Sequence, residues 1–357
     1  MSFPLPLPAR WFNSYPMSFK TSIKSEMLDQ SAGTPLDLLA RHLQTDMDKV
    51  NALILDRLHG DIPLIGQVAS HLIAAGGKRI RPLLTLAATA LYGPVPAKAY
   101  GLAASVEFIH TATLLHDDVV DESAQRRGKD SANIVFGNQA PVLVGDFLFS
   151  RAFQLMVEEG SMEVLRILSD ASAIIAQGEV MQLQNINNVE ISMEDYNTII
   201  GSKTAALFAA ACEIGPVIAG ADKQAQAALR AYGYNLGMAF QIADDVLDYN
   251  ANREKLGKTI GDDFREGKMT APLLLAYAKA DTTEKAFWTR TIAEKDQKEG
   301  DLQTAIGILQ KYKALEEGLA LSDAYAALAH KALSHAPEGP LKPILDDLIA
   351  FTINRSH

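Results

Sequence analysis

Two acidic clusters with the same spacing are the residues of this sequence best suited to chemistry. The stretch "LHDDVVDE" places Asp117, Asp118 and Asp121 in an otherwise apolar run, and "IADDVLDY" repeats the pattern with Asp244 and Asp248. Residues four apart lie on one face of a helix, so each cluster directs two carboxylates the same way. Like charges in an apolar setting repel one another and lose hydration, so both clusters require cations.

The ligand atoms of these clusters indicate which cation they would bind. Carboxylate oxygens are hard ligands that suit Mg²⁺ or Mn²⁺, and Mg²⁺ sites usually combine a few carboxylates with substrate phosphates. A single cluster is more often an acidic helix end or a solvated helix face. Two copies with apolar flanks favour a metal site that holds phosphate. The candidate metal ligands are Asp117, Asp118, Asp121, Asp244 and Asp248.

Basic residues that could bind phosphate are distributed over several motifs. Each alone could be ordinary surface charge, but together they supply cations for two diphosphates, one bound with metal and one without. The paired glycines of "GGKRIRP" would also let the backbone approach a ligand. The candidates are Lys78 and Arg81 in "GGKRIRP", Arg126 and Arg127 in "RRGK", Lys203 and Thr204 in "GSKTAAL", and Lys258 and Lys268 in "GKTIGDDFREGK".

His110 lies seven residues before Asp117 and therefore on the same helix face, within about 20°. A histidine on a helix face is more often a hydrogen-bonded core residue than a ligand. For His110, a diphosphate-binding role and a structural role are equally well supported by the sequence.

Composition excludes several classes of protein. The chain has 357 residues, 48% hydrophobic and 21% charged, which fits a globular protein with a large core. A net charge of −10 argues against a nucleic-acid binder. The one cysteine, Cys212, excludes an internal disulfide and indicates a reducing compartment.

Helical periodicity begins near Pro35 and continues through the chain, interrupted by clusters of glycine and proline. We predict one all-α domain of ten or more helices over residues 35–357, after a flexible tail at residues 1–34. The apolar stretch Thr204 to Ala221 predicts a buried helix that ends near Gly215, and no membrane span or secretory signal is evident. We expect a cytoplasmic protein; the alternative is a mitochondrial one, if the tail is a transit peptide.

The motifs, in this order, resemble those of the trans-isoprenyl diphosphate synthases, and among them the long-chain polyprenyl diphosphate synthases of quinone side-chain synthesis. The resemblance covers roughly Gly76 to Pro272 and includes "GGKRIRP", "FIHTATLLHDDVVDES", "FGNQAPVLVGDFLFSRAF", "GEVMQL", "SKTAALF", "FQIADDVLDY" and "GKTIGDDFREGKMTAPLL". It implies a helical bundle around a deep central cavity and a homodimer. The substrates it implies are isopentenyl diphosphate and an allylic primer, farnesyl or geranylgeranyl diphosphate.

The resemblance also implies a role for each motif residue. Asp117 and Asp121 would hold two Mg²⁺ ions on the allylic diphosphate, and Asp244, with Asp248 nearby, would hold the third; Mn²⁺ could substitute. The allylic contacts would be Arg126, Lys203, Gln241 and Lys258, and the isopentenyl contacts would be Lys78, Arg81, His110 and Arg127. We count Lys203 and Lys258 with the three metal-holding aspartates as catalytic, and Thr204 and Lys268 as further substrate contacts.

Product length is expected to depend on side chains just before the first cluster. In the family that the motifs resemble, bulky aromatic residues four or five positions earlier close the product tunnel. Those positions are Thr113 and Ala112 here, both small, and Phe108 lies one turn further. We therefore expect a product of roughly eight to ten isoprene units, about C40–C50, mainly from the overall resemblance. Release of such a product is compatible with loose membrane association.

Alternative functions remain open at this stage. A shorter-chain farnesyl or geranylgeranyl diphosphate synthase would share the motifs. A metal-dependent helical phosphohydrolase could use His116 and Asp117 but needs further histidine ligands, which have no helpful spacing. A terpene cyclase normally replaces the second acidic cluster, and a regulatory subunit would be expected to lose some aspartates.

Overall fold

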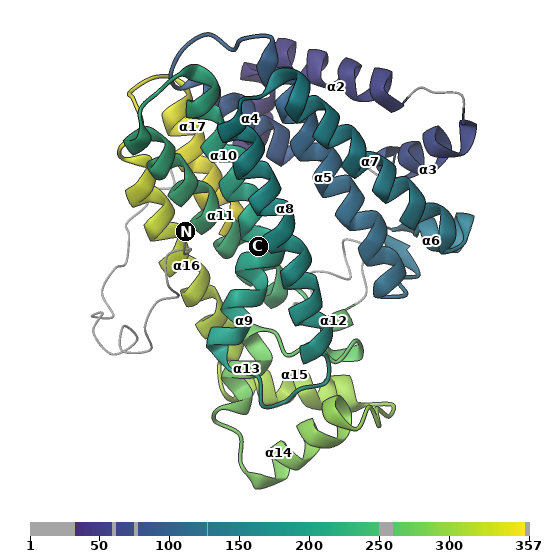
Figure 1. Cartoon of the computed structure of the whole chain (residues 1–357). Helices are drawn as coiled ribbons and strands as arrows, with labels where there is room; N and C mark the ends of the chain where they lie inside the picture. Colours follow the sequence, from purple (N-terminus) through teal and green to yellow (C-terminus); the bar gives the residue numbers. More distant parts are fainter. Residues whose placement is uncertain (1–32, 59–61, 75–77, 127, 250–259, 354–357) are drawn as a thin grey trace.

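The structure is a computed structural model that describes residues 33–58, 62–74, 78–126, 128–249 and 260–353, and it is built almost entirely of helices (Figure 1). Within these residues the only strands are β1 (Gln125–Arg126) and β2 (Lys129–Asp130), which pair antiparallel. The predicted all-α class and helix number are confirmed. The first helix of the described residues begins at Pro35, where the sequence predicted that helical periodicity begins, behind a capping box formed by Thr34 and Asp37. Residues 1–32 of the predicted tail lie outside the described residues.

The helices follow one another with short connections. In chain order they are α1 Pro35–His42, α2 Gln44–Leu58, α3 Pro63–Ala74, α4 Ile80–Ala90, α5 Lys98–Val120, α6 Ala132–Phe136, α7 Gln139–Glu159, α8 Met162–Asn185, α9 Met193–Ile200, η2 Gly201–Ala205, α10 Ala206–Ala219, α11 Lys223–Leu247, α12 Asp262–Arg265, α13 Ala271–Tyr277, α14 Thr282–Trp288, η4 Thr289–Ala293, α15 Asp301–Lys311, α16 Ala314–Leu333 and α17 Leu341–Ile353. The elements η2 and η4 are single π-helical turns.

Long helices form the centre of the molecule. Helix α11 packs between α10 and α16, α10 packs on α4 and α8, and α5 packs on α7 (Figure 1). Two clusters of buried apolar side chains fill the spaces between them. One includes Leu84, Phe108 and Phe208 in the upper part of the bundle, and the other includes Phe264 and Trp288 towards α14 and α15. The two acidic motifs therefore lie on α5 and α11, the helices that the core holds most extensively.

Both motif helices end at their acidic clusters. Helix α5 stops at Val120 with Asp121 as its C-cap, and α11 stops at Leu247 with Asp248 as its C-cap. The C-terminal end of a helix carries a partial negative charge, so aspartates there are electrostatically unfavourable, and neither helix has a basic residue in its last turn. Cations must therefore come from other elements or from solution.

Helix α10 corrects one prediction. We expected it to end near Gly215, because Gly-Pro usually marks a helix end, but it continues through Pro216 to Ala219 and ends at Gly220, whose φ is +75°. Gly215 instead allows close packing, because a Cβ there would lie 2.6 Å from the Ala88 carbonyl carbon and 2.7 Å from the Thr89 nitrogen of α4. Burial against α4 outweighs the backbone hydrogen bond that Pro216 cannot donate.

Two described stretches are long and apolar enough to span a bilayer by length and composition, Gln139–Glu159 and Met193–Ala219. The second is 72% buried inside the molecule, which is typical of a core helix. The first is α7, which is 44% buried and leaves much of its apolar surface exposed. This exposed face bears on the assembly of the protein, considered below.

Replacing Gly215 by alanine should destabilise the protein by about 1–3 kcal/mol, because the added methyl group forces α4 and α10 apart. Gly307→Ala is the matched control. Gly307 is an exposed helical glycine in α15 with nothing within 4 Å of an added Cβ, so alanine there should leave stability unchanged or raise it by about 0.5–1 kcal/mol. Urea unfolding of both variants measures the effect; equal stability of the two would show that the α4–α10 contact is not as close as described.

Candidate active site

The first acidic cluster meets two lysines from distant parts of the chain. The ammonium nitrogen of Lys203 lies 3.7 Å from Asp117 Oδ2, and that of Lys268 lies 3.3 Å from Asp121 Oδ2. Burial raises the pKa of Asp117 and the Asp121 charge adds to this, while Lys203 opposes it. Burial works against the charge on Lys268, but the carboxylates of Asp121 and Glu266 raise its pKa above the usual range. Two aspartates and two lysines thus lie close together in a partly buried part of the structure.

The position of Lys203 depends on an unusual piece of helix. It lies in the π-helical turn η2, a feature often found at functional sites. Two glycines bring this turn close to its neighbours. A Cβ on Gly178 of α8 would lie 2.8 Å from the backbone nitrogen of Lys203, and one on Gly237 of α11 would lie 2.7 Å from Ala205 Cα. Small residues on α8 and α11 therefore place Lys203 beside the end of α5.

Glu179 belongs to the same group and was missed by the sequence analysis. Its Oε2 accepts a hydrogen bond of 2.7 Å from Lys203 Nζ, while its buried Oε1 has no hydrogen-bond partner among the described residues. Burial raises the pKa of Glu179, while Lys203 lowers it. The motif "GEVMQL" was noted, but spacing along α8 says nothing about a lysine on η2, so no sequence signal could make this pairing.

The second acidic cluster is completed by Asp263, another residue without a predicted role. Asp244 is half-buried at the end of α11, whereas the Asp248 carboxylate is buried and accepts a 3.0 Å hydrogen bond from the Asp263 backbone N–H. Burial, with the nearby charges of Asp248 and Asp245, raises the pKa of Asp263 well above its usual range. The crowding of carboxyl groups at the end of α11 therefore favours the protonated, neutral form of Asp263.

A hydrogen-bonded chain joins this cluster to η2. Asp245 accepts a bond of 2.6 Å from the Tyr196 hydroxyl and one of 2.8 Å from the Gln241 amide, and Gln241 accepts a bond of 2.8 Å from the Thr204 hydroxyl. Burial raises the pKa of Asp245 to about 7, although both hydrogen bonds favour its charged form. The predicted substrate contacts Thr204 and Gln241 are therefore brought together.

Asp118, predicted as a metal ligand, binds Arg126 in this structure, and its role in metal binding stays a prediction. Its side chain is fully buried, and Oδ1 accepts a 2.6 Å hydrogen bond from the Nε of Arg126. Burial raises the pKa of Asp118, and Arg126 lowers it. Neighbouring positions on a helix are turned by about 100°, so Asp118 faces away from Asp117 and holds Arg126 instead. Arg127 and Lys258, two other predicted contacts, lie outside the described residues.

Two of the residues predicted for the metal-free diphosphate, Arg81 and His110, lie within hydrogen-bonding distance of each other. Arg81 at the start of α4 lies with Nη1 3.1 Å from His110 Nε2 on α5, and its guanidinium packs 4.4 Å from the centre of the Phe208 ring. The Lys78 ammonium lies 5.3 Å from the centre of the Phe351 ring. Aromatic faces stabilise these cations without neutralising their charge.

The predicted product-length residues follow α5 into the core. Phe108 and Ala112 are buried in the first apolar cluster, and the half-buried Thr113 donates a 2.8 Å hydrogen bond to the His110 carbonyl. The position of these side chains below Asp117 is compatible with a tunnel wall. That role, and the deep cavity itself, stay predictions.

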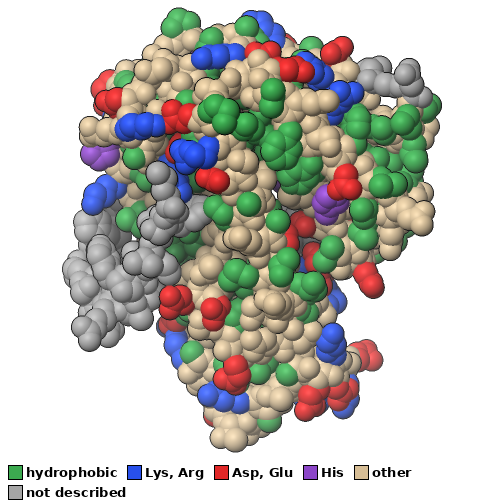
Figure 2. Space-filling view, in the orientation of Figure 1, with side chains coloured by type: hydrophobic (Ala, Val, Ile, Leu, Met, Phe, Trp, Pro, Cys, Tyr) green, Lys and Arg blue, Asp and Glu red, His purple; other side chains and the backbone are tan. Residues whose placement is uncertain are grey.

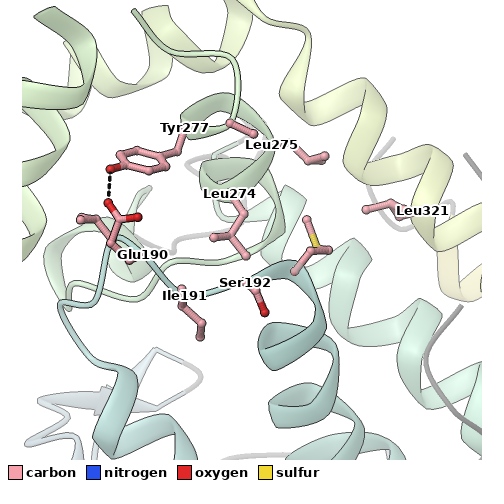
Figure 3. A pocket seen from close by; sticks show the side chains of 10 residues that line it. Glu190, Ile191, Ser192, Leu274, Leu275, Tyr277 and Leu321 are labelled. Carbon is pink, nitrogen blue, oxygen red and sulfur yellow. Dashed lines mark hydrogen bonds between the residues drawn. The ribbon is translucent and has the colours of Figure 1, made fainter. Parts of the chain in front are cut away.

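Two hollows lie near these elements. A cavity of about 150 Å³ is lined by Lys203, Thr204, Gln241, Asp245 and Lys268, together with Gln182 and Asn185 of α8 and Tyr196, Ile199 and Ile200 of α9. A larger surface groove of about 440 Å³ lies between the start of α9, α13 and α16, where Tyr277 donates a 2.8 Å hydrogen bond to Glu190 (Figure 3). The groove contains none of the predicted site residues, so only the small cavity belongs to the site.

The donor set fits a hard cation, but only with help from a ligand. Within the described ranges, no three histidine, cysteine or acidic side chains form a group that could hold a metal ion by themselves. Mg²⁺ sites usually combine a few carboxylates with substrate phosphate oxygens, and the carboxylates here fit that pattern. His116 contributes nothing, because it packs on Phe149 and its Nε2 lies 3.1 Å from the Val142 carbonyl oxygen. The phosphohydrolase alternative loses its only histidine.

The contrast between Asp117 and Asp118 makes a prediction. In metal-free protein, Asp117→Asn should keep or raise the free energy of unfolding, because it removes a buried charge that Asp121 repels, and it should abolish turnover. Asp118→Asn should lower the free energy of unfolding by about 1–3 kcal/mol, since it weakens a charged hydrogen bond to Arg126. Urea unfolding with EDTA present decides; a destabilised Asp117→Asn beside an unaffected Asp118→Asn would reverse the two assignments.

Comparisons with known proteins agree with this geometry. The chain matches the family model of polyprenyl synthetases over residues 62–309. It is 44% identical over 310 residues to octaprenyl diphosphate synthase of Escherichia coli (strain K12), a match that covers 87% of this chain and 96% of the relative. It is 42% identical over 322 residues to the enzyme of the same name from Haemophilus influenzae, covering 90% and 98% of the two chains.

Solved structures give the same result. A decaprenyl diphosphate synthase from Rhodobacter capsulatus is 50% identical, superposes with a TM-score of 0.88, and is matched over 90% of this chain and all of that chain. A polyprenyl synthase from Caulobacter crescentus, solved in complex with calcium and isoprenyl diphosphate, is 51% identical with a TM-score of 0.86, and the match covers 90% and 98% of the two chains. The chain belongs to the polyprenyl synthetase family and is a prenyltransferase.

Proposed function

We propose that this chain is a Mg²⁺-dependent synthase that adds isopentenyl diphosphate units, head to tail, to farnesyl or geranylgeranyl diphosphate and makes an all-trans product of about C40–C50 for a quinone side chain. The observation that carries the proposal is the approach of Lys203 and Lys268 to the aspartates at the end of α5, beside a small polar cavity. The names of the relatives, octaprenyl and decaprenyl diphosphate synthase, support a long product.

The proposed reaction begins with departure of the allylic diphosphate. Asp117, Asp121 and Asp244, with Asp248 behind them, would hold about three Mg²⁺ ions, whose chemistry is to neutralise charge on the leaving group. Lys203 and Lys268 would turn from the aspartates to the phosphate oxygens. Breaking the C–O bond leaves a delocalised allylic cation, and the diphosphate takes both bonding electrons.

Carbon–carbon bond formation follows on the metal-free side. Arg81, His110 and Lys78 would bind the second diphosphate by charge and hydrogen bonds, and so direct the alkene of isopentenyl diphosphate towards the cation. The alkene electrons form the new bond, and one proton is lost. The released diphosphate can accept this proton, so no protein base is required.

Assembly as a homodimer is part of the proposal. Apolar side chains stand exposed along α6, α7 and α8, and Figure 2 shows them gathered over α6 and α7 at the upper right. The exposed residues are Ile134, Val135, Leu143, Phe153, Val157, Met162, Val180 and Leu183. A contiguous patch of this kind usually marks an interface. The proposed partner of this patch is a second copy of the chain. We place the dimer in the cytoplasm, in loose contact with a membrane when the product is released.

Incubation with labelled isopentenyl diphosphate and farnesyl diphosphate tests the function. Millimolar Mg²⁺ or Mn²⁺ should support formation of long polyprenyl diphosphates, because the clusters are uncompensated without metal and phosphate together. Excess EDTA should abolish incorporation, and product chromatography gives the chain length. Full turnover in EDTA would disprove the metal role, and a C15 or C20 end product would favour the shorter-chain alternative.

Filling Ala112 should shorten the product. A larger side chain at this fully buried position adds volume where the growing tail is proposed to pass, and a packed site yields little without strain. Across Ala112→Val, Ala112→Leu and Ala112→Phe, the main product should fall stepwise towards geranylgeranyl or farnesyl diphosphate, with the first condensation largely kept. Full-length product at normal yield from Ala112→Phe would show that Ala112 does not line the tunnel. Loss of the first condensation already in Ala112→Val would show that the position supports the helix instead.

A further inference from the structure

Asp245, in the second acidic motif, differs from Asp244 in that its carboxylate is buried and hydrogen-bonded within the protein. It is 5% exposed, and both of its carboxylate oxygens accept hydrogen bonds, Oδ2 from the Tyr196 hydroxyl at 2.6 Å and Oδ1 from Gln241 Nε2 at 2.8 Å. Tyr196 is 4% exposed and comes from α9, whose start is fixed by a capping box. Both oxygens of the Asp245 carboxylate thus accept hydrogen bonds, one from α9 and one from α11.

The hydrogen bonds of Gln241 run in one direction, from the Thr204 hydroxyl to the Gln241 carbonyl and from the Gln241 amide group to Asp245. Gln241 Nε2 donates a 2.8 Å hydrogen bond to Asp245 Oδ1, so the NH₂ group of Gln241 faces Asp245. The carbonyl of Gln241 must then face Thr204, whose hydroxyl lies 2.8 Å away and donates its only proton to that carbonyl. The amide orientation therefore follows from the acceptor at position 245 and not from rotamer preference.

The oriented amide lies on the wall of the small cavity. Gln241, Thr204 and Asp245 line this cavity together with Lys203 and Lys268, the two cations proposed to bind the allylic diphosphate. A primary amide carries two N–H donors, and the bond to Asp245 uses one of them. The second donor is fixed in direction as soon as the first is. A reversed amide would place its carbonyl, an acceptor, where phosphate oxygens need a donor.

We propose that Tyr196 and Asp245 form a positioning pair, whose task is to orient the Gln241 amide so that an N–H meets the allylic diphosphate. Asp245 is thereby a positioning residue and not a metal ligand, although it lies within the second acidic motif. The inference rests on the proposed function, because it deepens the allylic part of that site. The Tyr196 hydroxyl, which is bonded to Asp245, is proposed to act on the substrate through Asp245 and Gln241, so the effect of removing this hydroxyl should disappear when Gln241 is absent.

A double-mutant cycle of Tyr196→Phe and Gln241→Ala tests this dependence. Tyr196→Phe should raise the KM for farnesyl diphosphate by roughly three- to tenfold, the effect of losing about one ordinary hydrogen bond. The KM for isopentenyl diphosphate and the Mg²⁺ dependence should not change. The double variant should be no worse than Gln241→Ala alone, because both changes remove the same oriented donor. Tyr277→Phe, which removes a tyrosine hydroxyl bonded to Glu190 in the surface groove, is the matched control and should behave as wild type.

The same double-mutant cycle can be measured without turnover, as the affinity of each variant for inorganic diphosphate with Mg²⁺ in calorimetry. Circular dichroism checks that each variant is folded. If Tyr196→Phe does not fold, Asp245→Asn takes its place in the cycle. Additive losses, an equal rise in both KM values, or an unchanged KM for the allylic substrate would overturn the positioning role. Absence of product from wild type and Tyr277→Phe alike would instead count against the proposed function, and the calorimetric cycle would still decide the inference.

Discussion

Excess negative charge at the C-terminal ends of α5 and α11 is the constraint on which the rest of the structure depends. Each helix places three aspartates in or just after its last turn, where the helix dipole already disfavours them. Glu179 and Asp263 place further carboxyl groups beside these ends from neighbouring elements. In the ligand-free structure Lys203 and Lys268 offset part of this charge. In the proposed function, metal ions and diphosphate offset the rest when they bind together, so that relief of unfavourable electrostatics contributes to substrate binding.

The remaining features of the site can be understood from this constraint. The π-helical turn η2 and the glycines facing it bring Lys203 to the end of α5, and the connection after α12 brings Lys268 to the same place. Asp118 and Asp245, the middle residues of the two motifs, are buried and hold Arg126 and Gln241. Each motif therefore combines aspartates proposed to hold metal with one that fixes a neighbouring substrate contact. The apolar core of α5 continues below the charged end, where a hydrocarbon tail could be accommodated.

The sequence predicted the parts of this site that depend on position within one helix. Spacing placed Asp117 with Asp121 on α5, and composition with punctuation predicted the all-α fold and the start of the first helix at Pro35. It failed where two elements meet. The end of α10 was misplaced because Gly-Pro is a local stop signal, whereas contact with α4 extends the helix. The pairing of Lys203 with Glu179, and that of Tyr196 with Asp245, join residues 24 and 49 positions apart, and no pattern along the chain encodes them.

The most direct test of the central claim is the thermal stability of the metal-free protein with Mg²⁺ alone, inorganic diphosphate alone, and both. If the aspartates need metal and phosphate jointly, the two ligands together should raise the Tm by clearly more than the sum of their separate effects. A joint ligand at a hundred times its Kd adds about 2.7 kcal/mol to the stability of the folded state. Asp117→Asn and Asp244→Asn should each remove this synergy. A full shift with diphosphate alone in the presence of EDTA, or synergy that survives in both variants, would contradict the account.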